Sequence, residues 1–104
     1  MGDIKDAKEC TTMGQVRAGV DALDCKLVAM IVKRQAYMSA AARIKEDRGT
    51  VYDSARIEEV ITKVKTEAKR LGLSAQIAEP VWREMIKQSI TYEFKEWDRI
   101  RKTA

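Results

Sequence analysis

The sequence predicts an all-α protein with three helices, one long and two shorter. Glycine and proline together account for only six of the 104 residues, too few for a loop-rich β-sandwich or a disordered chain. Aromatic residues are scarce, whereas the helix-forming types Ala, Lys, Glu, Arg and Met are abundant. Hydrophobic residues also recur at intervals of three and four along three separate stretches. At this length we expect one domain over residues 1–104, with 1–11 as a flexible N-terminus.

The first predicted helix begins near Thr11 or Thr12, because a threonine side chain can cap the first amides of a helix. Its hydrophobic residues keep helical spacing as far as Ala41, and the next helix-breaking residue is Gly49. The helix would therefore span roughly 34 residues and about 50 Å, with 48–53 as a loop after it. A globule of this size is about 35 Å across. Either the helix end stands in water or a second chain covers it, most simply in a two-fold dimer.

The second predicted helix begins at Asp53 or Ser54, both common N-cap types, and ends at Gly72, a common residue just after a helix. The third begins after Ser74 and continues almost to the end of the chain. Pro80 lies inside this third helix and removes one backbone hydrogen bond. We therefore expect a kink or a loosened first turn there.

Composition excludes several kinds of protein and of catalytic site. The chain has no histidine, so it lacks the commonest general base and every triad that contains histidine. Cys10 and Cys25 are fifteen residues apart, which fits no usual metal spacing, and we expect both thiols to be reduced. The sequence contains no run of about 18 apolar residues, the length needed to span a membrane. Its N-terminus is polar, so we expect no signal peptide. We therefore expect a cytoplasmic protein without metal, cofactor or membrane partner.

Polar residues interrupt the hydrophobic stripes of the first and third predicted helices. Arg34 and Lys45 are eleven residues apart, so they lie within about 20° of each other on the apolar face. Arg17 lies about 100° from Arg34 and must face a different neighbour. On the third helix, Ser89 and Glu93 share the apolar stripe. Burying two cations, a hydroxyl and a carboxylate is costly unless something compensates, which favours a pocket for an anionic ligand.

Three other interpretations remain open at this point. The cations could keep their charged ends in water, with Glu93 paired to Lys45 or Arg34. A nucleic-acid-binding module would use the net charge of +4, but its basic residues should cluster on one exposed face. Here they alternate with acidic residues, and the only basic group, at 98–102, is small. A helical dimer without any ligand is the third possibility.

Several stretches match the pattern of a known family in both order and spacing. They are 16–24 (VRAGVDALD), Lys33-Arg34, Lys45, 52–56 (YDSAR), Gly72-Leu73 and 86–93. Over roughly Thr11 to Trp97 the chain resembles the all-α chorismate mutase family, which includes the related isochorismate-pyruvate lyases. The resemblance implies an intertwined homodimer of three-helix protomers in the shikimate pathway of aromatic amino acid biosynthesis. It also implies pericyclic conversion of the dianion chorismate to prephenate, a reaction that needs no metal, histidine or nucleophile.

The resemblance also implies roles for particular residues. Arg17 would reach into the other protomer's site and bind one carboxylate of the substrate, while Arg34 would bind the other carboxylate. Lys45 would donate a hydrogen bond to the ether oxygen, with Glu93 beside it. The expected catalytic residues are therefore these two together with Arg34. The other residues of the substrate site would be Asp53, Arg56, Ile57, Ser89 and Ile90.

Two of these positions depart from most family members. Glu93 replaces a glutamine, as in some fungal mutases, and it can donate a hydrogen bond only when protonated. We therefore expect activity to decline as the pH rises through neutrality. Ile57 replaces the glutamate that contacts the ring hydroxyl in typical mutases, and an aliphatic residue there resembles the lyases. The short loop after Lys45 and the Glu-Cys-Thr sequence at 9–11 also resemble the lyases, whereas Asp53 resembles the mutases. Mutase activity is the first expectation and isochorismate-pyruvate lyase activity the alternative.

Overall fold

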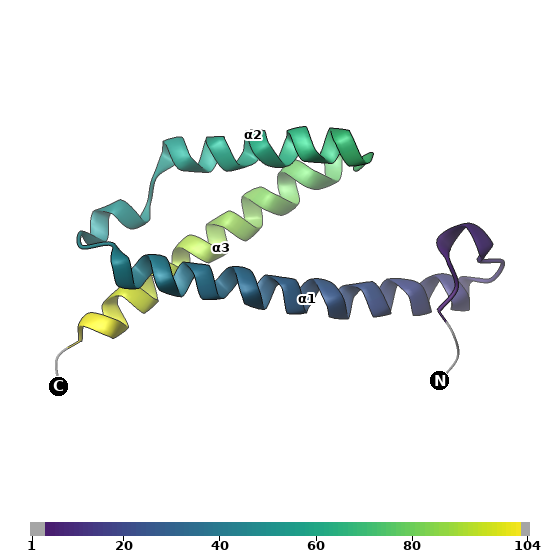
Figure 1. Cartoon of the computed structure of the whole chain (residues 1–104), viewed down its shortest axis with the longest axis horizontal. Coiled ribbons are helices and arrows are strands. Elements are labelled where there is room, and N and C mark those ends of the chain that lie inside the picture. Colours follow the sequence, from purple (N-terminus) through teal and green to yellow (C-terminus); the bar gives the residue numbers. More distant parts are fainter. Residues whose placement is uncertain (1–3, 103–104) are drawn as a thin grey trace. The chain divides into compact units, whose positions relative to one another are not determined.

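The structure is a computed structural model that describes residues 4–102. Five elements follow one another in this range (Figure 1): η1 (Ala7–Glu9), α1 (Met13–Ile44), η2 (Arg48–Val51), α2 (Ser54–Leu71) and α3 (Ala75–Arg101). The two η elements are short 3-10 helices, and the described residues contain no strand. The predicted all-α class with one long and two shorter helices is confirmed. None of the described helices is both long enough and apolar enough to cross a membrane.

The helices begin where side chains cap their first amides. At the start of α1, Thr12 Oγ1 accepts a hydrogen bond from the Gln15 N–H at 3.2 Å, and Gln15 Oε1 accepts one from the Thr11 N–H at 2.8 Å. Such a reciprocal pair satisfies amides at both sides of the helix start. At the other two helix starts the cap side chain accepts one hydrogen bond: Asp53 from the Arg56 N–H in α2, and Ser74 from the Gln76 N–H in α3. The predicted starts of all three helices are confirmed.

Gly72 ends α2 and turns the chain toward α3. Its φ angle is 86°, in the left-handed region that glycine adopts at little cost. Its own N–H and that of Leu73 both donate to the carbonyl oxygen of Ala68. After this turn α3 continues as one helix through Pro80. Where the sequence predicts a loop at 48–53, the structure contains η2.

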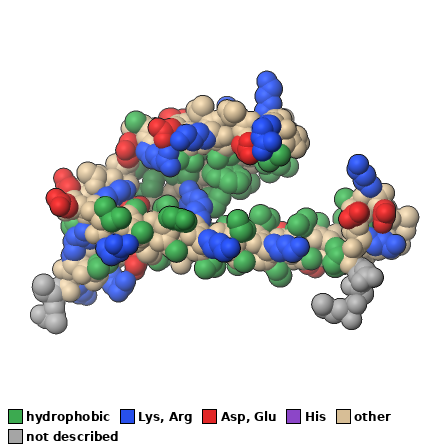
Figure 2. All heavy atoms as spheres, in the orientation of Figure 1, with side chains coloured by type: hydrophobic (Ala, Val, Ile, Leu, Met, Phe, Trp, Pro, Cys, Tyr) green, Lys and Arg blue, Asp and Glu red, His purple; other side chains and the backbone are tan. Residues whose placement is uncertain are grey.

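The chain divides into two compact units, Met1–Ala36 and Tyr37–Ala104. In the second unit, α2 and η2 both pack on α3. Charged side chains cover the outer surface of α2 (Figure 2). The core of the second unit is made of small and aliphatic residues: Ala42, Val51, Ile61, Ala68, Ala78 and Ile86.

The first unit contains η1 and most of α1, whose hydrophobic residues are largely uncovered. Leu23, Leu27 and Met30 are each more than half exposed, and Figure 2 shows hydrophobic side chains along the length of α1. The length of the predicted helix led us to expect such an uncovered stripe on a single chain. Of the N-terminus expected to be flexible, residues 1–3 lie outside the described range, and Ala7–Glu9 form η1.

Candidate active site

The structure brings Lys45 and Glu93 together in the second unit. Lys45 directly follows α1, and its Nζ atom lies 2.8 Å from Oε2 of Glu93, in the second half of α3. Glu93 is 4% exposed and is the one buried charged residue in the described part of the chain. Both residues were expected on apolar helix faces, and their pairing is one of the arrangements considered from the sequence. A buried carboxylate requires such a partner, because its isolated charge would be costly to remove from water.

Ser89 and Ile90 lie on α3 about one turn before Glu93, and both are half-buried. Ile90 and Ile57 line the same pocket of about 220 Å³, so the structure also brings these two predicted residues together. The remaining residues around this pocket are Tyr52, Arg83, Ile86, Lys87 and Thr91. The pocket is therefore lined by three aliphatic side chains together with two cationic ones.

Asp53 and Arg56 are occupied by local interactions at the start of α2. The Asp53 carboxylate accepts a hydrogen bond from the backbone N–H of Arg56 at 3.0 Å. The Arg56 guanidinium forms an ion pair with Glu59, which lowers the pKa of that carboxyl group below its ordinary value. Asp53 thus serves as a helix cap in this structure, a role that its residue type also predicts.

Arg17 and Arg34 lie on the part of α1 that belongs to the first unit. Arg17 is exposed and Arg34 is half-buried. Lys45 and Glu93 belong to the second unit. The roles of the two arginines at the substrate therefore stay predictions.

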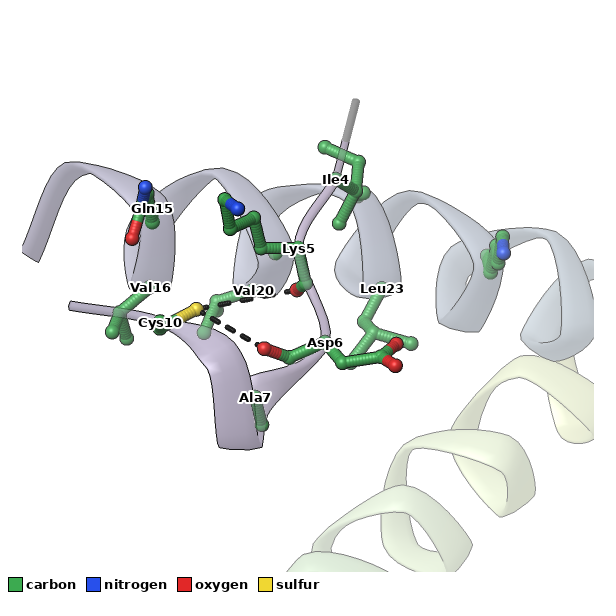
Figure 3. A pocket seen from close by; sticks show the side chains of 12 residues that line it. Ile4, Lys5, Asp6, Ala7, Cys10, Gln15, Val16, Val20 and Leu23 are labelled. Atoms are coloured by element: carbon green, nitrogen blue, oxygen red, sulfur yellow. Dashed lines mark hydrogen bonds between the residues drawn. The ribbon is translucent and has the colours of Figure 1, made fainter. Parts of the chain in front are cut away.

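A second pocket, of about 350 Å³, lies in the first unit between the segment around η1 and the first turns of α1. Hydrophobic side chains of α1, including Val16, Val20 and Leu23, form one wall (Figure 3). Cys10 also lines the pocket, and its thiol lies 4.0 Å from the carbonyl oxygen of Lys5 and 3.5 Å from that of Asp6. None of the predicted site residues lines this pocket.

Sequence reasoning missed several contacts that residues of α3 make with other segments of the second unit. Ser39 Oγ lies 2.8 Å from the Tyr92 hydroxyl and links the end of α1 to α3. The Arg48 guanidinium forms an ion pair with Asp98 and stands 4.6 Å from the centre of the Phe94 ring. No spacing rule could identify these pairs, because their members are about fifty residues apart.

Comparison with known proteins identifies the family. The sequence model described as "Chorismate mutase type II" matches residues 16–94, a range that contains every predicted site residue. The chain belongs to the chorismate mutase type II family. A relative from Pseudomonas aeruginosa, named isochorismate pyruvate lyase, is 25% identical to this chain over 101 residues. The match covers 97% of this chain and the whole of the relative. The resemblance predicted from the sequence is therefore confirmed at the level of the family, and the chain is an enzyme of the chorismate mutase-like class.

Proposed function

We propose that this protein is a chorismate mutase, which rearranges chorismate to prephenate in the shikimate pathway. The observation that carries the proposal is the ammonium group of Lys45 held beside the buried carboxyl group of Glu93, within the segment that matches the family. A chorismate-type substrate carries two carboxylates and an ether oxygen, and each of these groups attracts hydrogen-bond donors. Lys45 supplies such a donor at a fixed position.

The reaction needs orientation and electrostatic stabilisation rather than proton transfer to the protein. Arg34 and Arg17, the latter from the other protomer, bind the two carboxylates, since a guanidinium matches a carboxylate with two parallel hydrogen bonds. Holding the flexible dianion in its reactive conformation removes an entropic part of the barrier. Lys45 then stabilises the negative charge that develops on the ether oxygen as the carbon–oxygen bond breaks.

The pairing of Lys45 with Glu93 is compatible with this role. An ammonium group has three N–H donors, and the contact at 2.8 Å with Glu93 uses one of them. Two donors remain for the ether oxygen and for water. Glu93 in its protonated form would add an O–H donor on the same side.

A homodimer completes the proposal. The hydrophobic stripe of α1 is uncovered in the single chain, with Leu23, Leu27 and Met30 each more than half exposed. A second copy related by a two-fold axis would cover the same stripe on both chains. The intertwined arrangement implied by the resemblance would bring Arg17 of each chain to the site of the other.

A second candidate function is isochorismate-pyruvate lyase activity in the same site. Ile57 faces an aliphatic pocket with Ile86 and Ile90, where a typical mutase has a carboxylate. The relative from Pseudomonas aeruginosa that matches along its whole length carries the lyase name. This candidate needs the same restraint of a dianion and the same donor at the ether oxygen.

Separate incubations with chorismate and with isochorismate test both candidates. Prephenate from chorismate supports the mutase, whereas salicylate and pyruvate from isochorismate support the lyase. Arg34→Ala and Lys45→Met should remove either activity without unfolding the protein, and Lys63→Met, on the exposed surface of α2, is the control. The absence of all three products would contradict the proposal, and a steeply salt-dependent affinity for an oligonucleotide would favour a nucleic-acid-binding module instead.

A further inference from the structure

Two side chains of α3 hold the backbone carbonyl oxygen of Lys45. Trp97 Nε1 donates to this oxygen at 3.0 Å, and Arg101 Nη2 donates to it at 2.5 Å. A carbonyl oxygen has two lone pairs, so these donors satisfy its full capacity. Lys45 is therefore fixed at its backbone as well as at its amine.

Arg101 also closes the end of α1. Its Nη1 donates to the carbonyl oxygen of Ala42 at 3.0 Å, and its Nη2 lies 3.5 Å from that of Arg43. The last carbonyl groups of a helix have no partner within the helix, and a positive charge at this end is favourable. The guanidinium stands 4.1 Å from the centre of the Trp97 ring, which restricts it to the position from which it reaches α1.

Through these contacts α3 binds both the side-chain amine and the backbone carbonyl of Lys45. The amine contacts Glu93, and the carbonyl contacts Trp97 one turn further along α3. We propose that Trp97 and Arg101 are positioning residues, which fix the backbone at Lys45 so that its amine points at the reacting ether oxygen. This rests on the proposed function, because it assigns the purpose of the arrangement to catalysis by Lys45. It also gives a role to an arginine of the basic group at 98–102.

The alternative is that Trp97 and Arg101 only stabilise the fold, and kinetics separate the two roles. A displacement of about 1 Å at a catalytic group can cost about a hundredfold in rate. Loss of positioning should therefore lower kcat about ten- to a hundredfold and leave KM within about twofold. Loss of stability alone would lower the melting temperature but leave kcat unchanged at temperatures where the protein is folded.

The variants are Trp97→Phe, which keeps an aromatic ring and removes the N–H, and Arg101→Met, which keeps a long unbranched side chain and removes the donors. Arg101→Lys retains a charge and a donor, so it should recover part of the lost kcat. Arg99→Met is the matched control, because Arg99 lies in the same last turn and pairs with Glu96. Equal kcat values for the wild type, Trp97→Phe and Arg101→Met would overturn the proposal.

An NMR measurement tests whether Arg101 positions the amine of Lys45, and it does not require an activity assay. In proton–carbon NMR spectra, the Cε signals of Lys45, assigned by their loss in Lys45→Met, should be distinct from those of exposed lysines. They should move toward the exposed-lysine position in Arg101→Met and stay in place in Arg99→Met. Unchanged Lys45 signals in Arg101→Met would overturn the positioning role even if the wild type converts neither substrate, whereas failure of turnover alone would contradict only the proposed function.

Discussion

The amine of Lys45 and the carboxylate of Glu93 lie 2.8 Å apart, although 48 residues separate them in the chain. The contact joins the end of α1 to α3, and the side chain of Glu93 is only 5% exposed. Removing one member of such a pair leaves the other without its charge partner in a poorly solvated place. The pair therefore contributes to the fold, and it lies at the site that we propose for the substrate.

Lys45→Met should lower the free energy of unfolding by about 1–3 kcal/mol, because it leaves the buried Glu93 carboxylate without its donor. The double variant Lys45→Met with Glu93→Gln should be less destabilised than Lys45→Met alone, since no buried charge remains. Urea denaturation at one protein concentration measures both effects. A double variant that is less stable than either single variant would contradict this account.

Glu93→Gln should have a higher kcat with chorismate than the wild type at pH 7. The amide N–H of glutamine is a donor at the ether oxygen, whereas a carboxyl group donates only when it is protonated. Steady-state rates with chorismate in a buffer of constant ionic strength provide the measurement. A kcat of Glu93→Gln no higher than that of the wild type would count against Glu93 at the ether oxygen.

Mixing two inactive variants should restore activity if each site contains Arg17 from the other protomer. An Arg17→Ala chain paired with a Lys45→Met chain forms one intact site and one doubly impaired site. Random pairing makes half of the dimers mixed, so the mixture should regain about a quarter of the wild-type activity. Co-expression with two different affinity tags allows the mixed dimer to be purified and assayed. Activity no higher than the sum of the separate variants would show that the site is not shared.

Ile57→Glu should shift the enzyme toward chorismate. The new carboxylate would enter the pocket that contains Ile90 and Tyr52 and accept a hydrogen bond from the ring hydroxyl of the substrate. We expect the ratio of kcat/KM for chorismate over isochorismate to rise about tenfold or more. Ile57→Gln, which is polar but uncharged, is the control for polarity alone. An unchanged ratio in Ile57→Glu would indicate that this pocket does not contact the ring.

Arg83 should stabilise the protein at neutral pH and lose this effect in acid. Its guanidinium binds Glu58 at 3.0 Å and Glu79 at 2.9 Å, and these hydrogen bonds lower the pKa of both carboxyl groups below the ordinary value of 4.5. A carboxyl group with a lowered pKa in the folded state contributes stability above the unfolded value, and this contribution is lost as the pH falls through the folded value.

The melting temperature of Arg83→Met should therefore be below that of the wild type at pH 7, and the difference should shrink below pH 4.5. Lys87→Met removes a positive charge from the same helix and serves as the control. A difference that stays constant from pH 7 to about 3 would rule out the ion pairs as its cause.

The sequence by itself determined the three helices, their caps and the family. These features are local. Thr12, Asp53 and Ser74 each cap an amide within three residues, and the left-handed φ angle of Gly72 is a property of that one residue. Hydrophobic periodicity also placed Glu93 correctly on a covered face of its helix. Local propensity and periodicity are properties of neighbouring residues, so they can be inferred without knowing how the helices pack.

Only the tertiary structure decided which polar groups meet. Periodicity gives the direction of a side chain around its own helix but not the residue that faces it. The sequence offered Glu93 more than one cation, and the structure shows a contact with Lys45, which directly follows α1. Arg101 reaches Ala42 across 59 residues for the same reason. Contacts over such separations depend on how the helices pack. Sequence patterns predict each helix by itself and do not predict which residues of two helices meet.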